Sequence, residues 1–286
     1  MSATEFTATK VEMDDIPLDG QAADVKGRFE AIYGAEPETR NGWFHPSDWP
    51  RAAYVLGRMD PGERALDVGV GAGQFLNMVA LSGRYAEVAG LDRARFSKYQ
   101  EFSEIITRTD GSIDELPYPD NHFDVVTCME VLEHLPPEVF VAGLAELRRV
   151  CRGQLLMTVP FEEPEPLSKT HLRRFERTDI VEIFPDGRFT ILGRRRKPWV
   201  LIEERFDGAP FATLNEPLFD GANAATPAPP KKPAAVAAPV AAKKPAAPAK
   251  KASPPLTTTG RAVRWARRHA PAPVRAVARR VRGLLR

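Results

Sequence analysis

The sequence has few cysteines and no long apolar run. Its 286 residues hold two cysteines, Cys128 and Cys151, too few for a disulfide framework and without the paired spacing of a zinc site. No apolar run approaches the roughly 18 residues of a membrane-spanning helix. The first residues are acidic and lead into no apolar segment, which excludes a typical signal peptide. We therefore expect a cytoplasmic protein whose cysteines are reduced and buried.

Acidic residues are missing from one end of the chain. From Lys231 to Arg286 there are 6 Lys and 9 Arg and no Asp or Glu, a net charge of +15. Residues 1–230 hold 25 basic against 38 acidic residues, a net charge of −13, so the overall +2 hides two opposite parts. An acidic body does not by itself attract nucleic acid, whereas a basic arm can bind an anionic partner.

The composition of the basic end predicts two segments. Residues 221–256 are rich in Ala, Pro and Lys and cannot bury a core, which predicts a disordered linker. In residues 257–286, apolar positions recur three or four apart among arginines: Val274, Val277, Val281 and Leu284. This spacing predicts a short basic amphipathic segment. We expect it to bind the anionic inner face of a membrane, with nucleic acid as the alternative partner.

Between residues 41 and 220, short apolar segments alternate with helical patterns. The expected strands are 65–68, 87–91, 105–106, 124–128, 155–159, 189–192 and 200–204. The expected helices lie around 53–56, at 74–82, near 131 and at 137–149. Residues 1–40 form a weakly periodic acidic extension with a possible helix around 22–33. The alternation indicates parallel βαβ units in a doubly wound α/β fold with helices on both faces of the sheet.

A glycine-rich turn follows the strand at 65–68. Gly69, Gly71 and Gly73 lack the Cβ atoms that would keep a ligand off the main chain, and the helix start that follows offers free N–H groups. Asp92, at the end of the next strand, has the place of an acid that binds ribose hydroxyls. By itself the turn is compatible with a dinucleotide, with S-adenosylmethionine or with no ligand.

A second polar group follows the strand at 124–128, at the sheet edge where ligands of such folds bind. On a helix, positions three and four apart share a face, so Glu130, Glu133 and His134 are expected to converge. Two carboxylates and an imidazole suit a divalent cation, and oxygen and imidazole donors favour Mg²⁺ or Mn²⁺. Helix capping with a solvated charge pair is the alternative.

The order of these motifs resembles class I S-adenosylmethionine-dependent methyltransferases over about residues 50–205, with Phe123-Asp124-Val125-Val126 following the glycine turn and its acids. The resemblance implies a Rossmann-like, mostly parallel seven-stranded sheet. It implies that the glycine turn contacts the methionine part of S-adenosylmethionine, Asp92 the ribose and Asp110 the adenine amine. The expected cofactor-binding residues are Asp67, Gly69, Gly71, Gly73, Asp92, Asp110, Gly111, Ser112 and Glu130.

The Glu-x-x-Glu-His segment is similar to ubiquinone-pathway O-methyltransferases. Together with a later segment that begins at His171, it is also similar to metal-dependent small-RNA 2′-O-methyltransferases. That similarity implies four metal ligands: Glu130, Glu133, His134 and His171. Leu135 stands where the small-RNA enzymes have a second His, and the His-x-Phe order is loosened to His171 and Phe175, which counts against RNA as substrate. Without a metal, His134 or His171 is the expected catalytic base.

These features together predict an O-methyltransferase. The expected acceptor is a hydroxyl of a saccharide, glycolipid or related small diol, with S-adenosylmethionine as methyl donor and Mg²⁺ or Mn²⁺ as a possible aid. Arginines at 173, 174, 177 and 194–196 suit an anionic acceptor or a solvated surface. The alternatives are an RNA 2′-O-methyltransferase that grips nucleic acid with its basic tail and a non-catalytic cofactor-binding scaffold.

Overall fold

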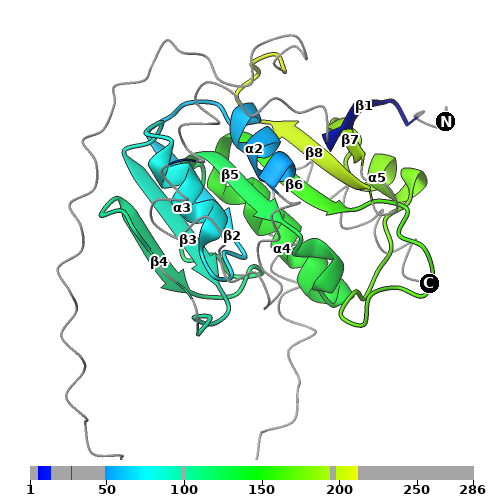
Figure 1. Cartoon of the computed structure of the whole chain (residues 1–286), viewed down its shortest axis with the longest axis horizontal. Helices are drawn as coiled ribbons and strands as arrows, with labels where there is room; N and C mark the ends of the chain where they lie inside the picture. Colours follow the sequence, from blue (N-terminus) through cyan, green and yellow to red (C-terminus); the bar gives the residue numbers. More distant parts are fainter. Residues whose placement is uncertain are drawn as a thin grey trace, which may run out of the picture.

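The computed structural model describes residues 6–13, 27, 49–97, 99, 101–193 and 198–211. Within them lies an eight-stranded sheet of order β1-β7-β8-β6-β5-β2-β3-β4 (Figure 1). The strands are β1 (Ala8–Glu12), β2 (Arg64–Val68), β3 (Glu87–Asp92), β4 (Ile106–Asp110), β5 (Phe123–Met129), β6 (Cys151–Pro160), β7 (Arg188–Gly193) and β8 (Trp199–Arg205). The helices are α2 (Trp49–Arg58), α3 (Gln74–Leu81), the short 3₁₀ turn η4 (Leu132–His134), α4 (Pro137–Val150) and α5 (Arg177–Ile183). Only β8 runs antiparallel to its neighbours β6 and β7, so the predicted doubly wound, mostly parallel sheet is confirmed.

The sheet has eight strands rather than seven, because β1 adds to it from the predicted acidic extension. β1 pairs in parallel with β7, with Ala8 opposite Phe189. The ring of Phe6 stacks on those of Phe161 and Phe189, at centroid distances of 5.6 and 5.4 Å. This five-residue strand has mostly half-exposed side chains and no apolar alternation, so the sequence pattern did not predict it. β1 therefore covers an edge that β7 would otherwise expose.

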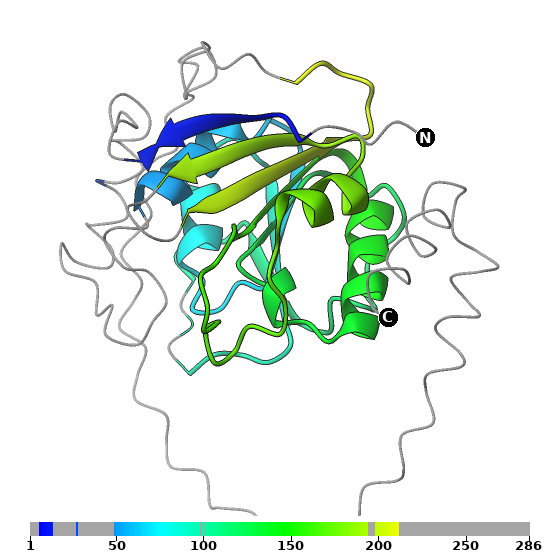
Figure 2. The ribbon, with the colours of Figure 1, turned by 90° about the vertical axis from the view of Figure 1, so that its right-hand side faces the viewer.

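An apolar core lies on each face of the sheet. α2 and α3 cover one face and α4 and α5 the other, as Figure 2 shows with the sheet nearly edge-on. Adjacent β5 residues point to opposite cores, Val125 toward α2 and α3 and Val126 toward α4 and α5. The predicted buried, unpaired cysteines are confirmed, since Cys128 and Cys151 are free thiols in the core beneath α4 and α5.

The segment from Glu130 to His134 is not the helix that its spacing predicted. Glu130 has a left-handed φ of 56°, and the helical part is limited to η4. Pro136 and Pro137 then begin α4. A proline disfavours helical backbone in the residue before it, which leaves no room for a longer helix here. Glu130, Glu133 and His134 therefore do not share an α-helical face.

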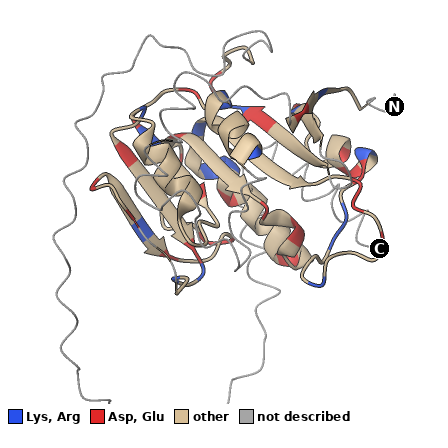
Figure 3. Ribbon diagram, in the orientation of Figure 1, with Lys and Arg blue, Asp and Glu red and all other residues tan. Residues whose placement is uncertain are grey.

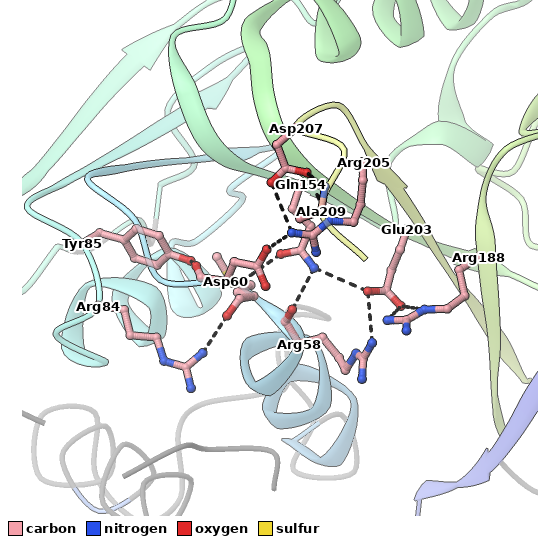
Figure 4. Close-up of polar contacts among 11 residues, drawn as sticks. Arg58, Asp60, Arg84, Tyr85, Gln154, Arg188, Glu203, Arg205, Asp207 and Ala209 are labelled. Carbon is pink, nitrogen blue, oxygen red and sulfur yellow. Dashed lines mark hydrogen bonds and ion pairs between the residues drawn. The ribbon is translucent and has the colours of Figure 1, made fainter. Parts of the chain in front are cut away.

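Buried ion pairs tie the elements together at the amino ends of the parallel strands (Figure 4). Glu203 of β8 is 0% exposed and accepts hydrogen bonds of 2.6 and 2.8 Å from Arg188. Its other oxygen lies 3.5 Å from Nη2 of Arg58, at the end of α2. The side chain of Gln154 donates to the Arg58 carbonyl and accepts from the main chain of Asp60, at 2.8 and 2.9 Å. Burial raises the pKa of Glu203, and the charge of Arg188 opposes that rise.

Several predictions concern residues outside the described ranges. These are the helix around 22–33 apart from residue 27, the linker at 221–256, the amphipathic segment at 257–286 and the basic run at 194–196. Across the described elements, acidic and basic residues are interspersed rather than segregated (Figure 3). None of the helices among the described residues is long and apolar enough to cross a bilayer.

Candidate active site

The chain turns sharply at the carboxyl end of β2. Gly69, Gly71 and Gly73 have φ angles of 87°, 52° and 90°, a region that residues with a Cβ rarely adopt. A Cβ on Gly69 would also lie 2.3 Å from Cγ2 of Val131. Gly73 caps α3 without a side-chain hydrogen bond, so bare main chain surrounds the helix start. The three predicted glycines thus form the cradle that a closely bound ligand requires.

Asp92 braces this cradle from the end of β3. Its Oδ2 accepts a 2.8 Å hydrogen bond from the N–H of Gly71, and its carbonyl accepts one of 2.9 Å from Gly111. Asp110 lies opposite Asp92 in the β3–β4 pair, and its exposed side chain binds Arg108. The hydroxyl of Ser112 binds Asp114 close by in sequence. The predicted cofactor residues after β2, β3 and β4 therefore gather at one sheet edge.

Asp67 supports the turn from inside the protein. It is 5% exposed, and the hydroxyl of Thr127 donates to its Oδ1 at 2.8 Å. Burial raises the pKa of Asp67 to about 7, the Thr127 hydrogen bond opposes this, and the charge of Asp92 adds to it. Its side chain is thus almost entirely buried at the end of β2, beneath the cradle.

Glu130 is held by the surrounding elements. Its Oε2 accepts a 2.6 Å hydrogen bond from Nε1 of Trp199, and its Oε1 accepts one of 3.1 Å from Thr158. Nη1 of Arg51 lies 3.0 Å from the same Oε1, and the Arg51 guanidinium stacks over the Trp199 ring. The predicted fourth metal ligand therefore faces α2 and β8, and the structure does not bring it to the other three. Neither Arg51 nor Trp199 was predicted, because their contacts join distant segments.

The other three predicted ligands do converge. Ligand atoms of Glu133, His134 and His171 lie within 4.8 Å of one another, and the two imidazole rings are 4.9 Å apart. Glu133 is 1% exposed, and neither of its carboxylate oxygens has a hydrogen-bond partner. Burial, followed by the charge of Glu130, raises its pKa to about 9, and its own backbone N–H and the charge of Arg51 oppose the rise. A buried carboxylate without a hydrogen-bond donor, next to two imidazoles, fits a cation.

Hydrogen bonds orient both imidazole rings. Nδ1 of His134 lies 2.9 Å from the carbonyl of Thr170, which can only accept, so this nitrogen carries the hydrogen. Nε2 of a neutral His134 is then bare, and it lies 3.8 Å from Oε1 of Glu133. Nδ1 of His171 lies 2.5 Å from Oε2 of Glu163. Glu163 was not predicted, since a carboxylate eight residues before a histidine in a loop forms no recognisable pattern.

Comparison with known proteins gives a domain match and several relatives. Residues 66–156 match the family model described as a methyltransferase domain. The ubiquinone biosynthesis O-methyltransferase of Xanthomonas axonopodis pv. citri (strain 306) is 34% identical over 106 residues, which are 34% of this chain and 44% of that protein. Its namesake from Bordetella parapertussis is 29% identical over 178 residues, 55% of this chain and 66% of that protein. The chain thus spans less than two thirds of the length of these two relatives.

Two further proteins are similar to this chain. The demethylmenaquinone methyltransferase of Tropheryma whipplei (strain Twist) is 26% identical over 182 residues, 58% of this chain and 72% of that protein. The crystal structure of Burkholderia thailandensis 1,6-didemethyltoxoflavin-N1-methyltransferase, with bound 1,6-didemethyltoxoflavin and S-adenosylhomocysteine, has a TM-score of 0.46 and 17% identity. That match covers 67% of this chain and 92% of the other. The matched domain, the relatives and the strand order support a class I S-adenosylmethionine-dependent methyltransferase.

Proposed function

We propose that this protein transfers a methyl group from S-adenosylmethionine to a hydroxyl oxygen of a saccharide, a glycolipid or a related small diol. The observation that carries the proposal is the unpartnered, buried Glu133 carboxylate beside His134 and His171, at the sheet edge that also holds the glycine turn. Two relatives are named O-methyltransferases, which supports oxygen as the acceptor atom.

The cradle at β2 suits S-adenosylmethionine. The positive φ angles of the glycine turn leave main chain open to a ligand, and Asp92 and Asp110 stand at the neighbouring strand ends. The cofactor supplies a methyl group on a positively charged sulfur. The turn from Gly69 to Gly73 holds no Lys or Arg that would repel this charge.

Glu133, His134 and His171 would hold Mg²⁺ or Mn²⁺ through one carboxylate oxygen and two imidazole nitrogens. The two imidazoles tilt the preference toward Mn²⁺. Such an ion lowers the pKa of a hydroxyl that binds to it. If no ion binds, the bare Nε2 of His134 can take the hydroxyl proton as general base. In either case these side chains fix the position of the acceptor oxygen, which methyl transfer requires because it proceeds in line.

The test combines binding with turnover. Calorimetry of the full chain with S-adenosylhomocysteine is expected to show binding. Tritiated S-adenosylmethionine is then offered with oligosaccharides, glycolipids, catechols and short RNA, after EDTA treatment and after return of Mn²⁺. We expect a methylated small hydroxylated acceptor and a gain with Mn²⁺. Methylation of RNA alone would overturn the acceptor class, turnover indifferent to EDTA would favour the histidine base, and binding without turnover would favour a scaffold.

We further propose that the basic end of the chain attaches the enzyme to an anionic membrane at its inner face. Support comes from its charge of +15 and the apolar stripe at 274–284. Each basic residue near such a surface contributes about 1 kcal/mol. Flotation with phosphatidylglycerol vesicles should retain the full chain and lose a chain that ends at Asp220. Equal flotation of both chains, or tight RNA binding by the full chain alone, would contradict the proposal.

A further inference from the structure

We propose that Glu163 is a positioning residue that fixes the tautomer and direction of His171. For its consequence in catalysis, this inference rests on the proposed function of the Glu133, His134 and His171 group. Glu163 does not belong to that group of possible ligands. It acts on the site through the ring of His171.

The Glu163 and His171 side chains form a buried pair. Glu163 is 4% exposed, and the side chain of His171 is 13% exposed. An ionised carboxylate has no hydrogen to donate, so at 2.5 Å the Nδ1 of His171 must carry the shared hydrogen. A neutral His171 then presents a bare Nε2 on the opposite side of the ring. Histidines that bind metals commonly have such a carboxylate partner, which sets the tautomer and makes the free nitrogen more basic.

The loop between β6 and α5 is fastened to η4 next to this pair. The N–H of Leu172 donates to the carbonyl of Glu133 at 2.8 Å, and the carbonyl of Thr170 binds His134 at 2.9 Å. Nη2 of Arg173 donates to the carbonyl of Leu135 at 3.1 Å. Because residues on both sides of His171 are held, the remaining freedom of its side chain is rotation about its own bonds. Glu163 removes that freedom.

Besides the Glu163–His171 contact, a main-chain hydrogen bond joins the start and the end of this loop. The N–H of Glu162 donates to the carbonyl of Phe175 at 2.9 Å, so Glu163 starts from a fixed main chain. The neighbouring Glu162 side chain is exposed and pairs with Arg177 at 2.9 Å. Glu162 is therefore a matched control: the same residue type, one position away, with its side chain directed to Arg177 rather than to the histidines.

The direct test is the tautomer of His171 in the full chain. Long-range proton–nitrogen NMR, under alkaline conditions that keep imidazole neutral, distinguishes Nδ1–H from Nε2–H, and a His171→Gln variant assigns the signal. We expect Nδ1–H in the wild type and in Glu162→Gln. Glu163→Leu, which removes the acceptor at similar volume, should shift the ring toward Nε2–H. Glu163→Gln, which keeps an acceptor oxygen, should retain Nδ1–H.

Mn²⁺ binding, followed by electron paramagnetic resonance, is the second readout. Loss of such a partner typically weakens metal binding about 10- to 100-fold, so we expect this for Glu163→Leu, a smaller loss for Glu163→Gln and none for Glu162→Gln. Affinity for S-adenosylhomocysteine should be the same in all variants, which controls for folding.

The outcomes separate this inference from the proposed function. Nε2–H in the wild type would overturn the inference, and so would an unchanged tautomer in Glu163→Leu. If Glu163→Leu does not fold, the wild-type tautomer and the Mn²⁺ affinity of Glu163→Gln still decide, because an unchanged affinity there would also count against it. A wild type with the expected tautomer that binds no Mn²⁺ would instead overturn the metal part of the proposed function and support the positioning role.

Discussion

The two edges of the sheet treat a buried carboxyl group in opposite ways. At the amino edge, Glu203 is fully buried and is met by Arg188 and Arg58 (Figure 4). At the carboxyl edge, Glu133 is just as buried, yet its oxygens have no hydrogen-bond donor. Proteins rarely leave a buried polar group unsatisfied, and when they do the group commonly has a functional role. Under the proposed function, this contrast means that the amino edge stabilises the fold and the carboxyl edge serves the reaction.

The sharpest test of this contrast replaces one glutamate by leucine at each edge, in two separate variants. Glu133→Leu should reduce methyl transfer about 10²- to 10⁴-fold, the usual contribution of proton-transfer assistance. It should also raise the free energy of unfolding of the metal-free protein by about 1–3 kcal/mol, because it removes an unsatisfied buried polar group. Initial rates and urea unfolding measure the two effects. A destabilised Glu133→Leu would mean that this carboxylate is structural.

Glu203→Leu should have the opposite outcome. It would leave the buried guanidinium of Arg58 without its carboxylate, and breaking a buried pair in this way costs about 3–5 kcal/mol. We expect a lower free energy of unfolding in urea and unchanged affinity for S-adenosylhomocysteine. A loss of cofactor binding in the folded variant would show that the two edges are coupled.

Asp67→Asn sharpens the comparison through pH. The folded-state pKa of Asp67 is raised from 3.8 to about 7, so its contribution to stability is complete below about pH 4 and is lost as pH rises through 7. An amide side chain does not titrate, so the variant should match the wild type near pH 4 and exceed it at about pH 8 by at most about 4 kcal/mol. Thermal unfolding without cofactor, across this range, provides the measurement. Parallel stability curves for the two proteins would contradict the raised pKa.

Asp92→Asn tests the brace at the carboxyl edge with a smaller expected effect. The amide oxygen still accepts from Gly71, but hydrogen bonds to a charged acceptor are stronger than those to a neutral one. Affinity for S-adenosylhomocysteine should fall about tenfold in calorimetry, with little change in melting temperature. An equal affinity would remove Asp92 from the cofactor site.

The smallest effect is expected on the surface. Glu162→Gln breaks an exposed pair with Arg177, and exposed pairs contribute little because water and salt screen them. Melting temperature and turnover should both match the wild type. A measurable loss in either would mean that the loop after β6 depends on this contact.

Much of the fold could be predicted from local pattern, because each parallel strand and its helix carry their own apolar signal. The glycine turn was equally visible, since positive φ restricts the residue types that a position accepts. β1 was not visible, because its stability comes from pairing with β7 far along the chain. The left-handed Glu130 and the Glu163–His171 pair likewise follow from tertiary contacts that leave no periodic trace. The predicted helical face would have joined Glu130 to Glu133 and His134, but the chain forms no such helix and Glu130 lies outside the group. His171 was expected only from the resemblance to a family, and loop contacts bring it to Glu133 and His134.

The pairing of β1 with β7 has a consequence for folding during synthesis. Ala8 leaves the ribosome before the other strands of the sheet, while its neighbour Phe189 is made far later. Throughout that interval β1 has no partner strand, and closing the long loop between β1 and β7 is slow. The earliest strand of this sheet is thus among the last that can dock, and until it does, the outer edge of β7 stays open to other nascent chains.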